Sequence, residues 1–477
     1  MKPVPFHPWL IVCCVVVLAA VPQTAAAWTL CVNPTGSNGC YSKIQTAVNH
    51  ASANEVINVE EGTYKEDVVI GIPLSLIGSG AGESVIDATG LENGIFVDGF
   101  HHPGLNNVTI AGFTIKNAQF EGILVVSAWD VIIRDNHIVD NDKSSGLLFT
   151  GKATGCPGQP AFETDETGDC GGALHLIGAV HSTVSGNTVS GNADGILISD
   201  ETAESRDNLV IHNTVTNNPL ECGIVLASHP PVGAIGSPHY GVHHNTVAEN
   251  VSTDNGVQIG GSGVGLFSDG IGPGRTSDNV IIRNKLTGNG LGGVALHTHV
   301  GPAFGAPADN MNANMIIGNF IAGNLADTFD TATPGRVGIN INSGDGGSPV
   351  RGTVISHNVI RDEDVDIAVN TPAEVDIHLN DLLGGKIGVA DVCALDASKV
   401  CTGSIDATEN YWGCPAGPGG PGCTTASGSD IRFTPALHKA NRDDDDRGPG
   451  NHDAINRDSA DGPHVAALLV TKRTSLC

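Results

Sequence analysis

The chain has 477 residues, among them 63 glycines, and only 4% are aromatic. Its 51 Asp and Glu against 23 Lys and Arg give a formal net charge of −28, which argues against nucleic acid or an anionic membrane surface as partner because phosphate binding relies on clustered cations. Few large rings and many glycines also argue against a conventional globular core and favour a repeat architecture with many sharp turns.

The first 27 residues are typical of a secretory signal peptide. Lys2 supplies a positive start, Trp9 to Val21 is an apolar run, and Ala25 to Ala27 offer small residues for cleavage. The run is shorter than the roughly 20 residues that span a bilayer, so a cleaved signal is favoured over a membrane anchor. No later segment looks transmembrane. We therefore expect a secreted or periplasmic protein cleaved near Ala27.

Cysteine spacing agrees with an oxidising compartment. Eight of the 12 cysteines form close couples, namely Cys31/Cys40, Cys156/Cys170, Cys393/Cys401 and Cys414/Cys423. Metal binding is the alternative, but no couple has C-x-x-C spacing and none has a nearby His pair, so disulfides are favoured. Cys222 and Cys477 have no obvious partner.

A short amphipathic helix is predicted at Ser42–Ala53. Ser42 would be its N-cap, and its apolar face would comprise Ile44, Ala47, Val48 and Ala51. If the rest of the chain is a stack of coils, this helix would cover the open edge of the first coil, because exposed sheet edges must be blocked.

From about residue 55 to 435 a short phrase recurs, in which Asn is followed five places later by a second Asn. Copies are Asn136/Asn141, Asn187/Asn192, Asn213/Asn218, Asn245/Asn250, Asn284/Asn289 and Asn319/Asn324, with a degenerate copy at Gly112/Asn117 and single residues at Asn358, Asn380 and Asn410. Apolar runs of period two flank the phrase and are too short for helices. Asn suits the turns between them because it tolerates left-handed backbone angles.

The closest phrases lie 22, 24 and 26 residues apart, which fits one coil of three short strands with turns. Longer steps would carry loop insertions. One coil cannot bury its own apolar face, so stacking is obligatory. We expect roughly a dozen coils, about 4.8 Å apart, in a rod of roughly 60 Å. A β-propeller is disfavoured because its repeats are longer and carry more Trp.

The C-terminal part of the solenoid is predicted to end in a cap formed by Asn410–Gly413 and the Cys414/Cys423 loop. Residues 438–477 have an acidic run, mixed charge and no periodicity, which is typical of a disordered tail. The domain organisation expected is a signal peptide at 1–27, one β-helix domain at 28–437 and the tail.

Three segments, Ile44–Val48, Val56–Glu66 and Leu74–Gly78, resemble the opening of pectin-lyase-like right-handed β-helix proteins. The repeats resemble the parallel β-helix repeats of that superfamily and of β-helix proteins linked to copper-site maturation in the periplasm. The resemblance extends to about residue 435. It implies an all-β, single-stranded right-handed parallel β-helix with a short N-terminal capping helix, but no single activity, because one fold hosts many functions.

No specific enzyme subfamily of this superfamily matches the sequence. The acidic trio of the hydrolases and the motifs of pectin esterases and common pectate lyases are missing. The Asp-Pro-His of alginate epimerases has only Ser237-Pro238-His239 as its nearest counterpart, which lacks the acid. No catalytic residue is therefore carried over from the resemblance.

Candidate site residues come instead from aligning the glycines that precede the strands at Gly195, Gly223, Gly263, Gly293 and Gly338. Six places on, neighbouring coils carry Glu201, His229, Asp269 and His299, and four places on one coil carries His297. Residues at equal offsets in stacked coils share a face, so these side chains are predicted to line an outer groove. The alternative is a solvated face, because 19 His residues will share faces by chance.

The chemistry of this set favours proton transfer near neutral pH by His229, His297 or His299. Glu201 and Asp269 are candidate ligands for a divalent cation such as calcium, and Arg275 could pair with a uronate carboxylate. Two functions stay open. One is a monomer that binds a polysaccharide and, if it is an enzyme, acts as a lyase or C5-epimerase; the other is a non-catalytic envelope module that binds sugar, metal or protein.

Overall fold

The computed structural model describes residues 29–144, 171–229, 240–268, 273–298, 307–326, 335–341, 348–370, 372–392 and 402–441. The expected signal peptide, two cysteine couples (Cys156/Cys170 and Cys393/Cys401) and most of the expected tail lie outside these residues, as do Asp269, His299 and Cys477. Among the described residues, no helix is long and apolar enough to cross a bilayer.

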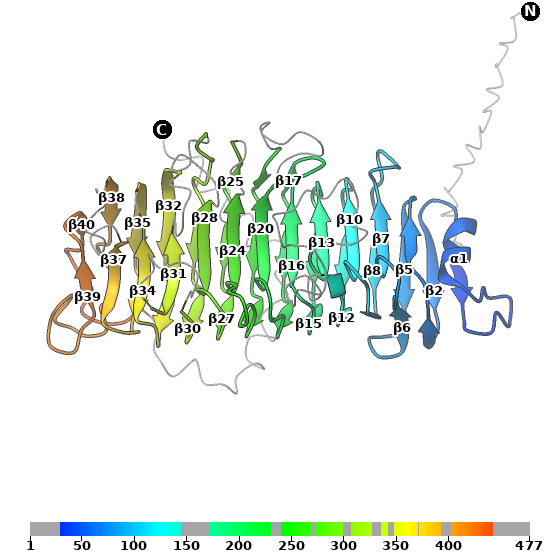
Figure 1. Ribbon diagram of the computed structural model, residues 1–477, viewed down its shortest axis with the longest axis horizontal. Coiled ribbons are helices and arrows are strands. Elements are labelled where there is room, and N and C mark those ends of the chain that lie inside the picture. The colour runs from blue at the N-terminus through cyan, green and yellow to red at the C-terminus, as the bar shows by residue number, and fades with distance from the viewer. Residues whose placement is uncertain are drawn as a thin grey trace, which may run out of the picture.

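The chain winds into three long sheets, here called A, B and C, which run the length of a rod (Figure 1). Every pairing between their strands is parallel, and neighbours in a sheet come from successive coils, so the protein is a parallel β-helix as predicted. Inward residues, mostly Val, Ile and Leu, form one continuous buried column along the axis.

Sheet A has 14 strands and, in spatial order, contains β1 (Thr29–Val32), β2 (Glu55–Val59), β5 (Leu74–Gly78), β8 (Thr109–Ala111), β11 (Ile132–Arg134), β14 (Thr183–Ser185), β18 (Leu209–Ile211), β22 (Thr246–Ala248), β26 (Val280–Ile282), β29 (Met315–Ile317), β32 (Val350–Ser356), β35 (Ala373–His378), β38 (Gly403–Asp406) and β40 (Ile431–Arg432). Sheet B has 11 strands, which are β3 (Gly62–Tyr64), β6 (Ser84–Asp87), β9 (Phe113–Lys116), β12 (His137–Val139), β15 (Thr188–Ser190), β19 (Thr214–Thr216), β23 (Val251–Thr253), β27 (Lys285–Thr287), β30 (Phe320–Ala322), β33 (Val359–Arg361) and β36 (Asp381–Leu382).

Sheet C has 12 strands, which are β4 (Val68–Ile70), β7 (Ile95–Asp98), β10 (Ile123–Val126), β13 (Leu174–Ile177), β16 (Ile196–Ser199), β20 (Ile224–Ser228), β24 (Val264–Ser268), β28 (Val294–Thr298), β31 (Val337–Ile341), β34 (Val365–Val369), β37 (Ile387–Asp391) and β39 (Thr425–Ser427). A short fourth sheet, D, lies between sheets C and A and contains β17 (Ser205–Arg206), β21 (Val242–His243) and β25 (Thr276–Ser277).

Buried asparagines stack along the rod in three ladders. In each ladder the side-chain oxygen accepts the backbone and side-chain amides of the residue one coil earlier; Asn284 Oδ1, for example, accepts Asn250 N at 2.9 Å and Nδ2 at 3.0 Å. The first ladder is Asn208, Asn245, Asn279 and Asn314. The second is Asn136, Asn187, Asn213, Asn250, Asn284, Asn319, Asn358, Asn380 and Asn410. The third is Asn141, Asn192, Asn218, Asn255, Asn289 and Asn324, and it ends on Glu363.

The ladders correct two details of the predicted repeat. The phrase at Asn245/Asn250 is displaced by one step, because Asn245 belongs to the first ladder and Asn250 to the second. In the degenerate copy the ladder positions are Phe113 and Ala118, whose amides donate to Asn136 and Asn141, rather than Gly112 and Asn117. Asn recurs every five residues in some coils, so sequence spacing alone admits a neighbouring register.

The first coil is covered by α1 (Ile44–His50), which is shorter than predicted. Ser42 is not its cap; Lys43 occupies that position and supplies no side-chain hydrogen bond. Instead Glu66 accepts the amides of Ile44 at 2.8 Å and Gln45 at 3.0 Å, so the cap comes from a distant part of the chain. Ile44, Ala47 and Val48 are buried as expected.

The opposite end closes on the fully buried Trp412, with the Phe433 ring 6.3 Å away. The Cys31–Cys40 and Cys414–Cys423 disulfides form as predicted. Cys222 is a buried free thiol, as expected for a cysteine without a couple. At the start of the expected tail, Asn441 N still donates to Asp381 at 2.8 Å.

Candidate functional site

The register of sheet C agrees with the glycine alignment. Ile196 pairs with Ile224, Ile224 with Val264, Val264 with Val294, and Val294 with Ile339, which places the five aligned glycines in one column. The outward positions four places on then follow the order Ser199, Ala227, Phe267 and His297. Residues at equal offsets on successive coils therefore lie next to one another at this end of sheet C.

Glu201 and His229 come together just past the ends of β16 and β20. Glu201 Oε1 lies 2.9 Å from His229 Nδ1. Only 1% of Glu201 and 3% of His229 is exposed. The predicted neighbourhood is thus correct, but the pair does not line an open outer groove; it is buried.

The pair belongs to a longer chain of buried polar contacts. Ser199 Oγ donates to the second oxygen of Glu201 at 2.5 Å, and His175 Nε2 lies 2.7 Å from Ser199 Oγ. Glu121 then lies 3.5 Å from His175 Nδ1. This relay, Glu121–His175–Ser199–Glu201–His229, crosses four coils that contain β10, β13, β16 and β20.

Proton positions follow from the donor inventory. Ser199 has a single hydroxyl proton and donates it to Glu201, so His175 Nε2 must carry the proton of its contact with Ser199. Glu201 as a carboxylate only accepts, so His229 Nδ1 is the protonated nitrogen and neutral His229 has its lone pair on Nε2. This is the orientation of an imidazole that can take a proton at Nε2 while a carboxylate stabilises the resulting cation.

Electrostatics support an ionised Glu201. Burial alone would raise the pKa of Glu201, but the hydrogen bond from His229, the positive charge that His229 and His175 carry when they are protonated, and the Ser199 hydroxyl hold it below its usual value. The neighbouring Asp200 behaves differently. Burial raises its pKa to about 8, against opposing hydrogen bonds from the Gly241 and His229 amides.

Asp200 has a structural role beside the relay. Its carboxylate accepts the His229 amide at 2.7 Å, the Ser228 hydroxyl at 3.1 Å and the Gly241 amide. These contacts tie the end of β20 to the start of β21. They fix the backbone of His229 and thereby the direction of its ring.

Arg275 and His297 lie at the same end of sheet C. The Arg275 amide donates to Ser228 Oγ at 3.1 Å, and its guanidinium contacts Ser277 at 3.1 Å and Asp278 at 3.7 Å with 35% of the side chain exposed. His297 packs on Phe267 with ring centroids 4.4 Å apart. Of the predicted set, Glu201 and His229 touch, and Arg275 contacts the residue next to His229.

Glu121, Ser199 and the link through His175 lie outside the set of site residues predicted from the sequence. Their signal is positional. His175 pairs with Leu197 across β13 and β16, and Ser199 follows two residues later on the same outward face. A comparison of residues at equal offsets does not pair side chains that contact each other diagonally between adjacent coils.

A comparison with known protein families identifies the fold. Residues 84–304 match the family described as the right handed beta helix region. Together with the parallel topology, this makes the protein a right-handed parallel β-helix. No curated protein sequence matches the chain significantly.

Several solved structures are similar to this chain at low sequence identity. An alginate lyase from Paenibacillus sp. str. FPU-7 is 14% identical, with 65% of this chain and 91% of that chain covered and a TM-score of 0.42. The A-module of a mannuronan C-5 epimerase from Azotobacter vinelandii is 14% identical, with 84% and 95% covered and a TM-score of 0.44. The catalytic unit of an α-1,3-glucanase from Streptomyces thermodiastaticus is 16% identical, with 84% and 66% covered and a TM-score of 0.47. These similarities carry no argument about the activity or substrate of this chain.

Proposed function

We propose that the protein binds an extracellular, uronan-type polysaccharide at the end of sheet C and transfers a proton there through His229. The observation that carries this proposal is the contact of 2.9 Å between Glu201 and His229, which orients the imidazole. The substrate class rests on the resemblance of the sequence to pectin-lyase-like proteins, which is an analogy of fold.

In the proposed reaction neutral His229 Nε2 takes the proton from C5 of a uronate residue, and Glu201 stabilises the imidazolium. For elimination, the C4–O4 bond breaks, a C4=C5 double bond forms, and the leaving oxygen takes up a proton. For epimerisation, water supplies a proton to the opposite face of C5, and the imidazolium releases its own proton to solvent. Arg275 would stabilise negative charge on the uronate carboxylate, and Asp269, His297 and His299 remain proposed members of the site.

Export is part of the same proposal. Both disulfides, Cys31–Cys40 and Cys414–Cys423, close loops of the kind found in proteins that fold in oxidising compartments. An N-terminal segment with the features of a signal peptide agrees with this. A comparison of the N-terminus of the exported protein with Trp28 would test the cleavage.

The direct test is an array of uronans incubated with the mature chain. Ultraviolet absorbance of an unsaturated uronate product would indicate elimination, and a change in the ratio of C5 epimers measured by proton NMR would indicate epimerisation. His229→Gln should lose the activity while the circular dichroism spectrum is retained. Absence of both binding and turnover on every uronan would refute the proposal.

A second function, a non-catalytic rod that binds sugar, metal or protein, is favoured by the burial of Glu201 and His229. If the pair only anchors the turns after β16 and β20, a variant with His229, Asp269 and His299 all changed to Ala should still fold and bind its partner. Loss of a measured activity in that variant, with folding and binding intact, would count against this alternative.

A further inference from the structure

A separate cluster of side chains lies on the outer face of sheet A near its C-terminal end. Asp376 and His378 belong to β35, and Asp406 belongs to the neighbouring strand β38. Asp376 and Asp406 are register partners, and alternate residues of a strand share a face. One oxygen or nitrogen atom from each of the three side chains lies within 4.8 Å of the other two.

The imidazole of His378 is oriented by the backbone. His378 Nδ1 lies 2.9 Å from the Thr408 carbonyl oxygen, and because a carbonyl only accepts, Nδ1 carries the proton. Nε2 then carries the lone pair, and it lies 4.0 Å from Asp406 Oδ2. A backbone carbonyl that fixes the imidazole tautomer in this way is the usual support of a metal-ligating His.

The carboxylate of Asp406 is oriented as well. Its Oδ1 accepts the Thr408 amide at 3.2 Å and the Thr408 hydroxyl at 2.9 Å. Its Oδ2 therefore faces His378, on the side of the cluster. The turn that contains Thr408 therefore orients two of the three side chains, His378 and Asp406. The third, Asp376, is exposed to solvent.

Arg432 neutralises the negative charge of the Asp406 carboxylate. It lies on β40 as the register partner of Asp406 and forms an ion pair with Asp406 Oδ2. Its side chain is 68% exposed. Asp406 is only 20% exposed, but an ion pair whose guanidinium lies in solvent contributes little stability, so a metal ion can displace Arg432 from Asp406.

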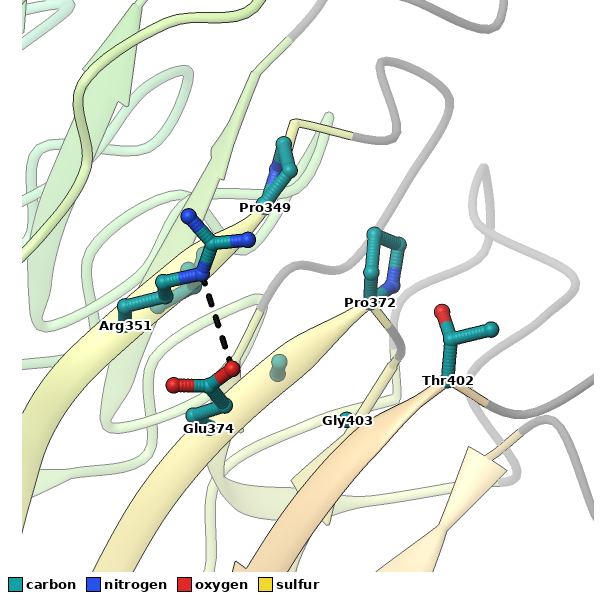
Figure 2. Close-up of a pocket in the computed structure, with 8 residues that line it drawn as sticks. Pro349, Arg351, Pro372, Glu374, Thr402 and Gly403 are labelled. Carbon is teal, nitrogen blue, oxygen red and sulfur yellow. Dashed lines mark ion pairs between the residues drawn. The ribbon is translucent and has the colours of Figure 1, made fainter.

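Within the part of the chain that the structure describes, the cluster comprises these three residues. Two residues before Asp376 on the same strand, Glu374 pairs with Arg351 at 3.6 Å. Figure 2 shows this ion pair at the rim of a small pocket between Pro349, Pro372 and Thr402, at the opening ends of β32, β35 and β38. Glu374 is therefore engaged away from the cluster.

We propose that Asp376, His378 and Asp406 bind one divalent transition-metal ion, with Zn²⁺ as the representative case. His378 Nε2 and one carboxylate oxygen from each Asp supply three ligands, and water completes the coordination. Imidazole nitrogen favours Zn²⁺, Ni²⁺ or Cu²⁺ over Ca²⁺ and Mg²⁺, which prefer all-oxygen sites. This site is separate from the proposed reaction at His229.

The test is isothermal titration of the full mature chain with Zn²⁺. The wild type should show one saturable site, and Asp376→Asn and His378→Ala should each weaken it at least about tenfold. Asp376→Asn keeps the shape of an exposed side chain, so it tests the ligand even if His378→Ala disturbs the Thr408 turn. Equal affinity in the wild type and Asp376→Asn would overturn the proposal.

A matched control exists on the same rod. His212 Nε2 lies 2.7 Å from Glu249, which also contacts Arg283 at 3.2 Å. This site has imidazole, carboxylate and guanidinium groups, but among the described residues no second carboxylate completes a cluster of three ligands. His212→Ala should leave the Zn²⁺ isotherm unchanged. If His212→Ala removes the site instead, the assignment to sheet A is wrong.

Arg432→Ala gives the sharpest outcome. Removing the competing cation should increase Zn²⁺ affinity several-fold, whereas a simple loss of surface structure would reduce it. Unchanged or weaker binding in a folded Arg432→Ala variant would show that Asp406 Oδ2 is not a ligand and would overturn the three-residue site.

Discussion

Glu201 and His229 are 28 residues apart in the chain, yet Oε1 of the acid lies 2.9 Å from Nδ1 of the imidazole because their coils are adjacent. Glu201→Gln should keep a hydrogen-bond acceptor and remove the charge that stabilises the imidazolium. If the proposed proton transfer occurs, kcat should fall by about 100-fold or more, measured on the uronan that the array identifies. Glu249→Gln, which changes the half-buried acid beside His212, is the control, and full activity in folded Glu201→Gln would contradict the role of Glu201.

The asparagine ladders should carry much of the stability of the rod. Asn284→Ala removes the acceptor of the Asn250 backbone and side-chain amides and the donor to the Val247 carbonyl, at a site that is 1% exposed. Unpartnered buried polar groups are unfavourable, so the free energy of unfolding should fall by about 3 kcal/mol or more. Urea denaturation measures this change.

Asn49→Ala is the matched control for the ladder. Asn49 is an exposed residue of α1 that accepts a surface hydrogen bond from Gln45 at 2.9 Å. Its replacement should change the free energy of unfolding by no more than about 0.5 kcal/mol. Equal losses in Asn49→Ala and Asn284→Ala would mean that the ladder contributes nothing special.

Glu363 should make stability depend on pH. It ends the third ladder by accepting Asn324 N and Nδ2, each at 3.0 Å, and burial raises its pKa to about 7 from 4.5, against the opposing hydrogen bonds of Asn324. As pH rises from about 4.5 to 7, the unfolded chain loses this proton and the folded chain keeps it, so stability falls by up to about 1.4 kcal/mol per unit.

Glu363→Gln keeps the acceptor and cannot ionise, so it should flatten that part of the pH profile. Urea midpoints of the two proteins, measured from about pH 4 to pH 8, give the difference directly. Asp200, whose pKa does not depend on Glu363, titrates in both proteins and cancels in the comparison. Asp366 does not cancel, because the charge of Glu363 helps to raise its pKa, and Glu363→Gln therefore also lowers the pKa of Asp366. Parallel profiles for the wild type and Glu363→Gln would refute this assignment.

Capping of α1 by Glu66 predicts a smaller effect. Glu66→Ala leaves the Ile44 and Gln45 amides without their carboxylate acceptor, and loss of a helix cap typically costs about 1 kcal/mol. Ser42→Ala should be neutral because Ser42 is not the cap. Thermal unfolding that moves more in Ser42→Ala than in Glu66→Ala would reverse this assignment.

The solenoid was predictable because its signals are local and repeated. The glycines at 195, 223, 263, 293 and 338 fall in one column, as alignment of the following strands predicts. The Asn245/Asn250 phrase was misplaced by one ladder because the true pair, Asn250/Asn255, has the same spacing. The cap of α1 was missed because Glu66 lies 22 residues beyond Ile44.

The candidate site was predictable only in part. Equal offsets correctly joined Glu201 to His229, since stacking places equal positions of adjacent coils together. The offsets did not indicate that the pair is buried, and they did not join His175 to Ser199, which meet across different offsets. Contacts between coils depend on the length and direction of side chains in three dimensions, and the spacing of residues along one coil does not predict them.

Successive members of the second ladder are between 22 and 51 residues apart, and the hydrogen bonds between them are the same throughout. Coil length can therefore change without disturbing the spine of the molecule. Natural variation or design could replace the segments that connect the sheets. The rod would then carry different surface residues while the asparagine ladders and the buried column stay the same.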